Sequence, residues 1–487
     1  MGIVGKQSIR NTIVTYIGFA IGAVNALYMY PIFLGETFYG LTNFILSSAN
    51  IMMPLMAFGV HNTMVKFYSG YKTEEEKSSF LTFMLFLPLL FIVPVMLIGL
   101  SFQEDIAALL SQRNAIIHDY VWMIPVIGLC MGYFEIFYAW VKVHFKSVYG
   151  SFLREVLLRV FMSFFLIAVY QSWLTPVQFI YASVWIYVAI TVMMIVSAFR
   201  VKKPVFTMRF PAVKKPLFVY SLFIIFSGSV ANLLLDIDKF MLSQYININN
   251  VAYYSVAVFI TLVIAVPSRA MHQIAYPLTA KLMTENKMDE LNSFYKKTSI
   301  SLQIVGGFVF LAILVNIKQV YLLLPAKYSG GIFVVFTIGL SKYLDLILGN
   351  NNAIIFNSKY YRMVLFLGLM LGIFAIGLNM VLIPKFGING AAVATLLAVT
   401  LYISAKLMFV VFKMKLFPFT RQTVYSLFVS VAVFFLFYYW DFGYHPLVNI
   451  LLKSALLTVV YVYANYKLKL SSDLNEVMDK VIGRFRP

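Results

Sequence analysis

The chain has 487 residues, of which 61% are hydrophobic and only 12% are charged, and its formal net charge is +19. A mean hydropathy of +0.86 excludes a water-soluble globular protein, and we predict an integral membrane protein. The positive charge is spread over many short segments, which indicates contact with anionic lipid and no nucleic-acid partner.

Apolar segments of membrane-spanning length recur along the whole chain. A spanning helix needs about 20 mostly apolar residues, each rising about 1.5 Å. The sequence therefore predicts an all-α polytopic membrane protein with about 14 transmembrane helices. The expected spans are residues 8–34, 39–68, 80–100, 120–141, 148–170, 177–199, 216–242, 251–275, 294–317, 331–355, 363–383, 388–411, 424–440 and 447–466.

Lys and Arg are concentrated on alternate connections between these spans. If the N-terminus is inside, the inner segments hold 28 of them, and the outer segments hold Arg113, Lys318, Lys327 and Lys385. Basic residues of short loops are retained on the cytoplasmic side of a membrane. We therefore expect both termini to be cytoplasmic.

The longest polar connection divides the chain into two similar halves. Tyr39 and Pro54 in one half have counterparts in Tyr253 and Pro267 in the other. Six crossings return the chain to its starting side, so this duplication predicts two six-helix bundles related by a pseudo-two-fold axis along the membrane normal, with a cleft between them. The predicted parts are an N-terminal lobe (1–199), a cytoplasmic interlobe linker (200–215), a C-terminal lobe (216–413), two extra helices, 13 and 14 (414–467), and a cytoplasmic amphipathic tail (468–487).

Four strings of residues resemble those of a known family. They are residues 11–12 (NT), 31–35 (PIFLG) leading to 38–40 (FYG), 238–243 (DKFMLS) followed by 252–257 (AYYSVA), and 379–395 (NMVLIPKFGINGAAVAT). On these strings the chain resembles the polysaccharide transport, or lipid-linked oligosaccharide (O-antigen type) flippase, family of the multidrug/oligosaccharidyl-lipid/polysaccharide exporter superfamily. In the last string, Pro384 and Gly387 would turn the chain, and the small residues after them would allow close helix packing.

This resemblance implies a transporter and no enzyme. Its cargo would be an undecaprenyl-diphosphate-linked oligosaccharide, a polysaccharide or O-antigen repeat unit, moved across the bacterial inner membrane by alternating access. The implied partners are this lipid, membrane lipids, a polysaccharide polymerase and glycosyltransferases. No cofactor is expected, and Na⁺ or H⁺ would be the coupling ion.

A diphosphate cargo calls for cations inside the spans, where ionisable groups are costly. The candidates are Arg269 and His272 after Pro267, and His61 and Lys66 after Pro54. Lys66 could instead be an ordinary positive-inside residue.

Other intramembrane cations have acidic neighbours on the same helix face. Arg159 lies four residues after Glu155, and Lys342 lies three before Asp345, so each pair can be structural. Arg159 and Lys342 remain candidate cargo ligands. Lys406 and Lys453 are near span ends, and we expect both to extend to the headgroups.

Asp236 and Asp238 are the candidate ion-coupling residues. The resemblance implies that acids in this helix bind the coupling ion. The two carboxylates are two residues apart and thus on roughly opposite faces, so only one of them can easily face a cleft. The alternative for Asp236 is an internal ion pair with Lys239.

Three other functions are weighed. A multidrug/cation antiporter of the same superfamily would share the architecture, but several carry an acid in the first helix, and residues 12–34 contain none. A membrane enzyme would need positioned acids or a metal site on a sizeable loop, which the sequence lacks. A lipid II flippase on the same scaffold is the nearest alternative.

The sequence generates one prediction about cargo binding. We expect Arg269→Ala to abolish export while the protein inserts normally, and Arg269→Lys to lose more activity than its retained charge suggests, because only arginine binds a diphosphate bidentately. Export assays with membrane-fraction immunoblots measure both quantities. Full activity of Arg269→Ala would remove this residue from the site.

Overall fold

Helices account for all of the regular secondary structure in the part of the chain that is described. The computed structural model describes residues 3–205, 217–218, 220–222 and 230–485. Lipid offers backbone N–H and C=O groups no hydrogen-bond partner, so an apolar chain satisfies them within helices. Ten helices in the described ranges are long and apolar enough to cross a membrane. The predicted class, an all-α polytopic membrane protein, is confirmed.

The two longest candidate spans are interrupted at glycine. Arg10–Met56 has 47 residues and Arg362–Met414 has 53, and each exceeds twice the roughly 20 residues that one crossing needs. Gly35 and Gly387 lie inside these segments with φ of 76° and 56°, a conformation that favours glycine. Each long segment therefore contains a turn between two helical stretches.

The chain divides into two compact units, Met1–Ser255 and Val256–Pro487. Unit 1 contains α1 (Ile3–Val24), η1 (Asn25–Leu34), α2 (Gly35–Met56), α3 (Val60–Phe67), η2 (Tyr68–Gly70), α4 (Glu74–Phe86), α5 (Leu89–Ser101), α6 (Gln103–Ser111), η3 (Ala115–Tyr120), α7 (Met123–Val143), α8 (Ser147–Phe152), η4 (Leu153–Leu157), α9 (Leu158–Tyr170), α10 (Pro176–Val201) and α12 (Val230–Tyr245).

Helix α13 (Asn249–Leu262) begins in unit 1 and ends in unit 2. Unit 2 continues with η5 (Val263–Ala265), α14 (Val266–Thr284), α15 (Met288–Leu322), η6 (Ala326–Gly331), α16 (Ile332–Leu346), α17 (Asn351–Asn357), α18 (Arg362–Phe409), η7 (Val410–Met414), α19 (Arg421–Tyr438), α20 (Pro446–Lys467) and α21 (Ser472–Phe485).

Helix α12, from the predicted C-terminal lobe, packs in unit 1 against α2. Asn114, just before η3, holds its end: its amide nitrogen donates to the carbonyl oxygens of Ser243 at 2.6 Å and Ile246 at 2.9 Å. Its amide oxygen accepts from the Ile248 N–H at 2.8 Å. Most of the predicted linker, residues 206–215, lies outside the described residues, and the predicted lobe boundaries stay predictions.

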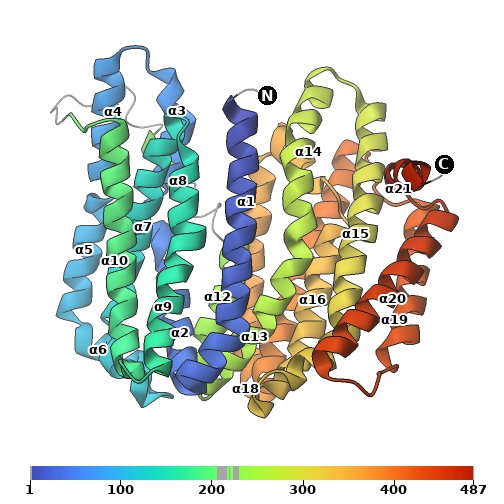
Figure 1. Cartoon of the computed structure of the whole chain (residues 1–487). Helices are drawn as coiled ribbons and strands as arrows, with labels where there is room; N and C mark the ends of the chain where they lie inside the picture. Colours follow the sequence, from blue (N-terminus) through green and yellow to red (C-terminus); the bar gives the residue numbers. More distant parts are fainter. Residues whose placement is uncertain (1–2, 206–216, 219, 223–229, 486–487) are drawn as a thin grey trace. The chain divides into compact units, whose positions relative to one another are not determined.

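Segments predicted to be cytoplasmic gather at one end of unit 1. The side chain of Gln7 donates to the carbonyl of Phe145, between α7 and α8. Lys202, after α10, donates to Glu74 at the start of α4 at 2.7 Å. The N-terminus, the α3–α4 turn and the end of α10 lie at this same end (Figure 1). The packing of unit 1 is therefore compatible with the predicted topology.

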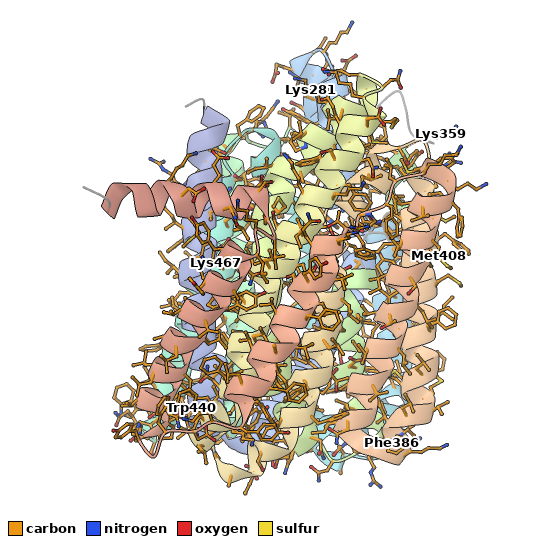
Figure 2. All side chains as sticks on the ribbon, turned by 90° about the vertical axis from the view of Figure 1, so that its right-hand side faces the viewer. Lys281, Lys359, Phe386, Met408, Trp440 and Lys467 are labelled. Atoms are coloured by element: carbon orange, nitrogen blue, oxygen red, sulfur yellow. The ribbon has the colours of Figure 1, made fainter. Side chains whose placement is uncertain are left out.

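In unit 2 as well, segments predicted to be inside and segments predicted to be outside lie toward opposite ends. Lys281 and Lys359, both predicted to be inside, lie at one end, and Lys467 lies toward it (Figure 2). Phe386 and Trp440, both predicted to be outside, lie at the other end. Helix α21, in the predicted amphipathic tail, is confirmed as a helix and lies across the end of α20 (Figure 1).

Pro54 and Pro267, the counterparts in the two predicted halves, each lie next to a break between helices. Helix α2 ends two residues after Pro54, and Phe58 and Gly59 then adopt left-handed φ of 48° and 63°. In unit 2, the 3-10 turn η5 separates α13 from α14, and Pro267 lies in the first turn of α14. A proline in the first turn of a helix loses no helical hydrogen bond. The break precedes Pro267, so a hydrogen bond lost at Pro267 does not cause it.

Small residues allow close packing at two places. A Cβ on Gly18 of α1 would lie 2.2 Å from the carbonyl oxygen of Glu155, and one on Gly22 would lie 3.1 Å from Nε of Arg159. This four-residue spacing matches the small-residue contact of membrane helices. In α18, a Cβ on Gly390 would lie 2.1 Å from the carbonyl oxygen of Leu382, which confirms the predicted turn and packing in residues 379–395.

The contact of α1 with η4 generates a stability prediction. We expect Gly18→Ala to lower the free energy of unfolding by about 1–3 kcal/mol, because the added methyl group has no room against backbone. Gly99→Ala in α5 is the matched control, since nothing lies within 4 Å of its Cβ position. Thermal unfolding in detergent measures both, and equal melting temperatures would contradict the close contact.

Candidate functional site

A cavity of about 250 Å³ lies inside unit 1 and has charged walls. It is enclosed by α2, α7, η4, α9 and α10. Its charged residues are Glu135 from α7, Arg154 and Glu155 from η4, and Arg159 from α9, and its other polar residues are Asn50, Tyr187 and Thr191.

The four charged side chains form a connected set of ion pairs. Nη1 of Arg154 lies 2.8 Å from Oε1 of Glu135, and its Nε lies 3.2 Å from Oε1 of Glu155. Nη2 of Arg159 lies 3.3 Å from Oε2 of Glu155. Each arginine thus has a carboxylate partner, which offsets the cost of placing charge inside a membrane protein. The predicted Glu155–Arg159 pair is confirmed.

The local backbone explains why these residues converge. Residues 153–157 form a π-helical turn, a wider turn than an α-helix and one that is frequent at functional sites. Asn25 of η1 anchors the next turn: it donates to the carbonyl oxygen of Arg159 at 3.0 Å and accepts from Ser163 at 2.7 Å. Together with the close approach of Gly18, this bond fixes η4 and α9 against the first helix.

Further ionisable groups lie around the cavity. His61 of α3 and Lys142 of α7 both interact electrostatically with Glu135. The Tyr187 hydroxyl interacts in the same way with Arg159 and with Asp236. Lys142 does not line the cavity, whose own lining has two arginines and two glutamates, so its formal charges balance.

The predicted cargo ligands of unit 1 separate in the structure. Arg159 lines the cavity and His61 lies near it, with its Nδ1 buried and without a hydrogen-bond partner among the described residues. Lys66 is exposed on α3, where its Nζ lies 3.8 Å from the ring centroid of Tyr220. A cation–π contact of this kind stabilises an exposed lysine without a carboxylate.

The two predicted ion-coupling aspartates of α12 have different surroundings. Asp236 is partly exposed and pairs with Lys239 at 3.4 Å, the internal pair considered as its alternative. Asp238 is fully buried and accepts a hydrogen bond from the Tyr254 hydroxyl at 2.5 Å. Of the two, Asp236 is the accessible carboxylate. Their role in coupling stays a prediction.

A second charged cluster lies inside unit 2 and centres on Lys406 of α18. This side chain is 1% exposed, and its Nζ donates to Asp345 of α16 and Asn352 of α17, both at 3.1 Å. The ammonium group also lies 4.3 Å from the ring centroid of Tyr402. The expectation that Lys406 reaches the headgroups is wrong, because a carboxylate, an amide and an aromatic ring bind it within unit 2.

Of the cargo ligands predicted in unit 2, His272 and Lys342 lie near this cluster and Arg269 lies apart from it. His272 interacts electrostatically with Asp345 and Lys406, and its ring packs edge-on against Tyr276. Lys342 acts electrostatically on Asp345, the partner predicted for it. Arg269 is exposed on α14 and forms no ion pair with a described residue. Their role in cargo binding stays a prediction.

Lys453 of α20 is also buried, which corrects the expectation that it extends to the headgroups. It is 1% exposed and donates to Asp441 at 2.9 Å and to the carbonyl of Val315 at 3.1 Å. Burial by itself raises the pKa of Asp441, but the hydrogen bonds from Lys453 and Gln319 outweigh burial, and the pKa lies below its ordinary value. Lys453 therefore fastens α20 to α15.

The sequence interpretation missed three residues of these clusters. Sequence patterns alone give no partner for Arg154 or Glu135, and they place Lys406 among the side chains that extend to the headgroups. The available signal was the presence of ionisable residues in or beside apolar spans, which is costly without a partner. Their partners come from other helices, so spacing along one helix could not reveal them. Within the described residues, no group of His, Cys, Asp and Glu could hold a metal ion.

Comparison with solved structures identifies the fold. The chain is similar to the lipid II flippase MurJ in an inward closed conformation, with a TM-score of 0.75 and 14% identity, over 94% of this chain and 98% of that one. It is also similar to an inward-facing multidrug resistance MATE transporter, with a TM-score of 0.59, 14% identity and 83% and 97% coverage. A transporter from Pyrococcus furiosus has a TM-score of 0.54 and 15% identity, with 83% and 94% coverage. The chain shares the fold of these transporters.

The family follows from the sequence match. The model of the polysaccharide biosynthesis protein family matches residues 4–283, more than half of the chain. The protein belongs to this family, as its resemblance to the polysaccharide transport branch predicted. A comparison with curated proteins gave no match.

The Lys406 cluster generates a stability prediction. We expect Lys406→Met to cost about 2–3 kcal/mol of unfolding free energy, because it leaves Asp345 without its lysine partner, and the half-exposed carboxylate moderates the penalty. The double variant Lys406→Met/Asp345→Asn should recover most of this loss. Thermal unfolding in detergent measures both, with exposed Lys467→Met as control. A single variant as stable as the unaltered protein would contradict a structural role for the pair.

Proposed function

We propose that this protein is a flippase that moves an undecaprenyl-diphosphate-linked oligosaccharide from the inner to the outer leaflet of the bacterial inner membrane. The observation that carries this proposal is the charged cavity of unit 1, where Arg154 and Arg159 are held by Glu135 and Glu155. Family membership supports it, because the family description concerns polysaccharide biosynthesis.

The chemistry of the cavity suits an anionic group better than a cationic drug. Arginine binds phosphate oxygens through two parallel N–H donors, and the glutamates keep the side chains oriented before the cargo arrives. The diphosphate of the cargo would replace carboxylate oxygens as the hydrogen-bond acceptor of the arginines. The guanidinium groups already lie in the cavity, so cargo binding would not have to strip water from them. The lining holds two arginines and two glutamates, so it has no net negative charge that would favour a cationic substrate.

The remaining elements of the proposal concern topology, coupling and partners. Both termini would be cytoplasmic, consistent with the gathering of predicted inner segments at one end of each unit. An ion gradient of Na⁺ or H⁺ would drive alternating access through Asp236, whose partly exposed carboxylate pairs with Lys239. A polymerase and glycosyltransferases would consume and supply the cargo.

The second candidate cargo is lipid II. The structural neighbour with a TM-score of 0.75 is a lipid II flippase, and the same diphosphate chemistry would serve that lipid. The neighbour with a TM-score of 0.59 is a multidrug resistance transporter. Export of cationic drugs by this chain is disfavoured, because it would call for an excess of acids, and the two glutamates of the cavity lining are matched by two arginines.

The deciding experiment is deletion of the gene followed by mass spectrometry of the undecaprenyl-linked glycans. We expect a lipid-linked oligosaccharide to accumulate and surface polysaccharide to be lost, because export stops after the repeat unit is assembled. Accumulation of lipid II would select the second candidate. Altered drug sensitivity with no accumulating lipid would favour the antiporter.

Two substitutions separate cargo binding from ion coupling. Arg159→Ala should reduce export at least tenfold at every ion gradient, because it removes a diphosphate ligand. Asp236→Asn should reduce gradient-driven export but leave cargo binding unchanged. Export into the outer leaflet of proteoliposomes, measured with and without imposed Na⁺ and H⁺ gradients, tests both. Lys72→Ala, an exposed loop change, is the control, and a normal gradient response in Asp236→Asn would reject the coupling role.

A further inference from the structure

Two adjoining pockets lie where α15, α20 and α21 meet in unit 2, apart from both charged clusters. The first, which we call the basic pocket, has a volume of about 490 Å³ and is lined by Lys296 and Lys297 of α15 and by Lys469 after α20. Asp479 of α21 is the only carboxylate among its lining residues in the described chain. None of the three lysines forms an ion pair with a described residue, so the pocket carries uncompensated positive charge.

The second pocket, which we call the apolar groove, has a volume of about 190 Å³. Its walls include Val305 and Phe308 of α15 and Leu474 and Met478 of α21. Ser471 and Asn475 line both pockets, so the basic pocket and the apolar groove adjoin each other.

The spacing of the two pockets along α15 matches an amphiphile. Eight residues separate Lys297 from Val305, which corresponds to about 12 Å along the helix axis at about 1.5 Å per residue. Lys297 is on the side predicted to be cytoplasmic, and Val305 is 37% exposed on the surface of the apolar span. A ligand that fills both pockets therefore needs an anionic head and an apolar chain that enters the membrane from its inner face.

The walls are held in place by hydrogen bonds that leave the lysines available. Oγ of Ser471 lies 3.2 Å from Oγ of Ser301 on α15. The Tyr466 hydroxyl donates to Asp479 at 2.6 Å, and the Asn475 amide donates to the Tyr466 carbonyl at 3.3 Å. These bonds fasten α21 across the end of α20, the arrangement that Figure 1 shows.

Lys469 occupies a position that usually favours glycine. Its φ is 49°, and it follows the end of α20, where the Leu470 N–H returns to the carbonyl of Asn465 at 3.2 Å. Glycine is the usual residue at such a left-handed helix end, because a Cβ there is crowded by the following carbonyl oxygen. The fold therefore tolerates a strained backbone at a residue that lines the basic pocket.

We propose that the basic pocket and the apolar groove together bind one anionic glycerophospholipid of the cytoplasmic leaflet, with its phosphate among Lys296, Lys297 and Lys469 and one acyl chain in the groove. Three lysines against one aspartate favour a lipid with net negative charge over a zwitterionic one. The bound lipid would fasten α21 to α15 and so stabilise the inner end of unit 2.

Native mass spectrometry of the purified full-length protein tests this site. We expect one molecule of phosphatidylglycerol to be retained at least tenfold more tightly than phosphatidylcholine, and to raise the melting temperature. The triple variant Lys296→Gln/Lys297→Gln/Lys469→Gln should lose this preference. A matched triple, Lys413→Gln/Lys467→Gln/Lys480→Gln, removes the same charge from residues that do not line the pocket and should keep it.

Two further experiments separate loss of lipid binding from loss of folding and test whether the acyl chains are needed. Lys469→Gly removes one charge while relieving the left-handed backbone, so weaker phosphatidylglycerol binding by a protein of equal or greater stability would support the site independently of folding. Glycerol phosphate has the anionic group without acyl chains and should not raise the melting temperature. Equal stabilisation by glycerol phosphate, equal retention of phosphatidylcholine, tighter retention of undecaprenyl diphosphate than of phosphatidylglycerol, or unchanged phosphatidylglycerol binding in the pocket triple would each overturn the proposal.

Discussion

The pairing of charges between helices is the constraint on which this structure most depends. A charged side chain inside a membrane protein is costly unless another group compensates it. In unit 1, Arg154 connects Glu135 of α7 to Glu155 of η4. In unit 2, Lys406 of α18 connects Asp345 of α16 to Asn352 of α17. The Arg154–Glu135 contact and both contacts of Lys406 join helices that are separate in the sequence.

Close backbone packing supplies the second requirement of the site in unit 1. The cavity exists because η4 widens into a π-helical turn and because Gly18 and Gly22 let that turn approach α1. The same glycines place the Arg159 guanidinium against the first helix, while Asn25 holds its backbone carbonyl. The packing of η4 and α9 against α1 therefore both stabilises unit 1 and positions the side chains of the candidate site.

The two charged clusters differ in what they can offer to a ligand. The cavity of unit 1 combines two arginines and two glutamates with aromatic and polar neighbours, so it presents bidentate donors in a preformed space. The Lys406 cluster has one fully buried ammonium group whose donors are occupied by Asp345 and Asn352. This difference supports the cavity of unit 1 as part of the proposed cargo site and a mainly structural role for Lys406.

The sequence by itself determined the class, the helices and the family. Apolar runs of spanning length require helices in lipid, Gly387 marks a turn, and residues 379–395 carry the family resemblance. It also predicted the Glu155–Arg159 pair, because four residues along one helix bring side chains together. Only the tertiary structure decided the Arg154–Glu135 pair and the partners of Lys406 and Lys453. These partners lie on other segments, and such pairing depends on packing distance, which periodicity along one helix does not encode.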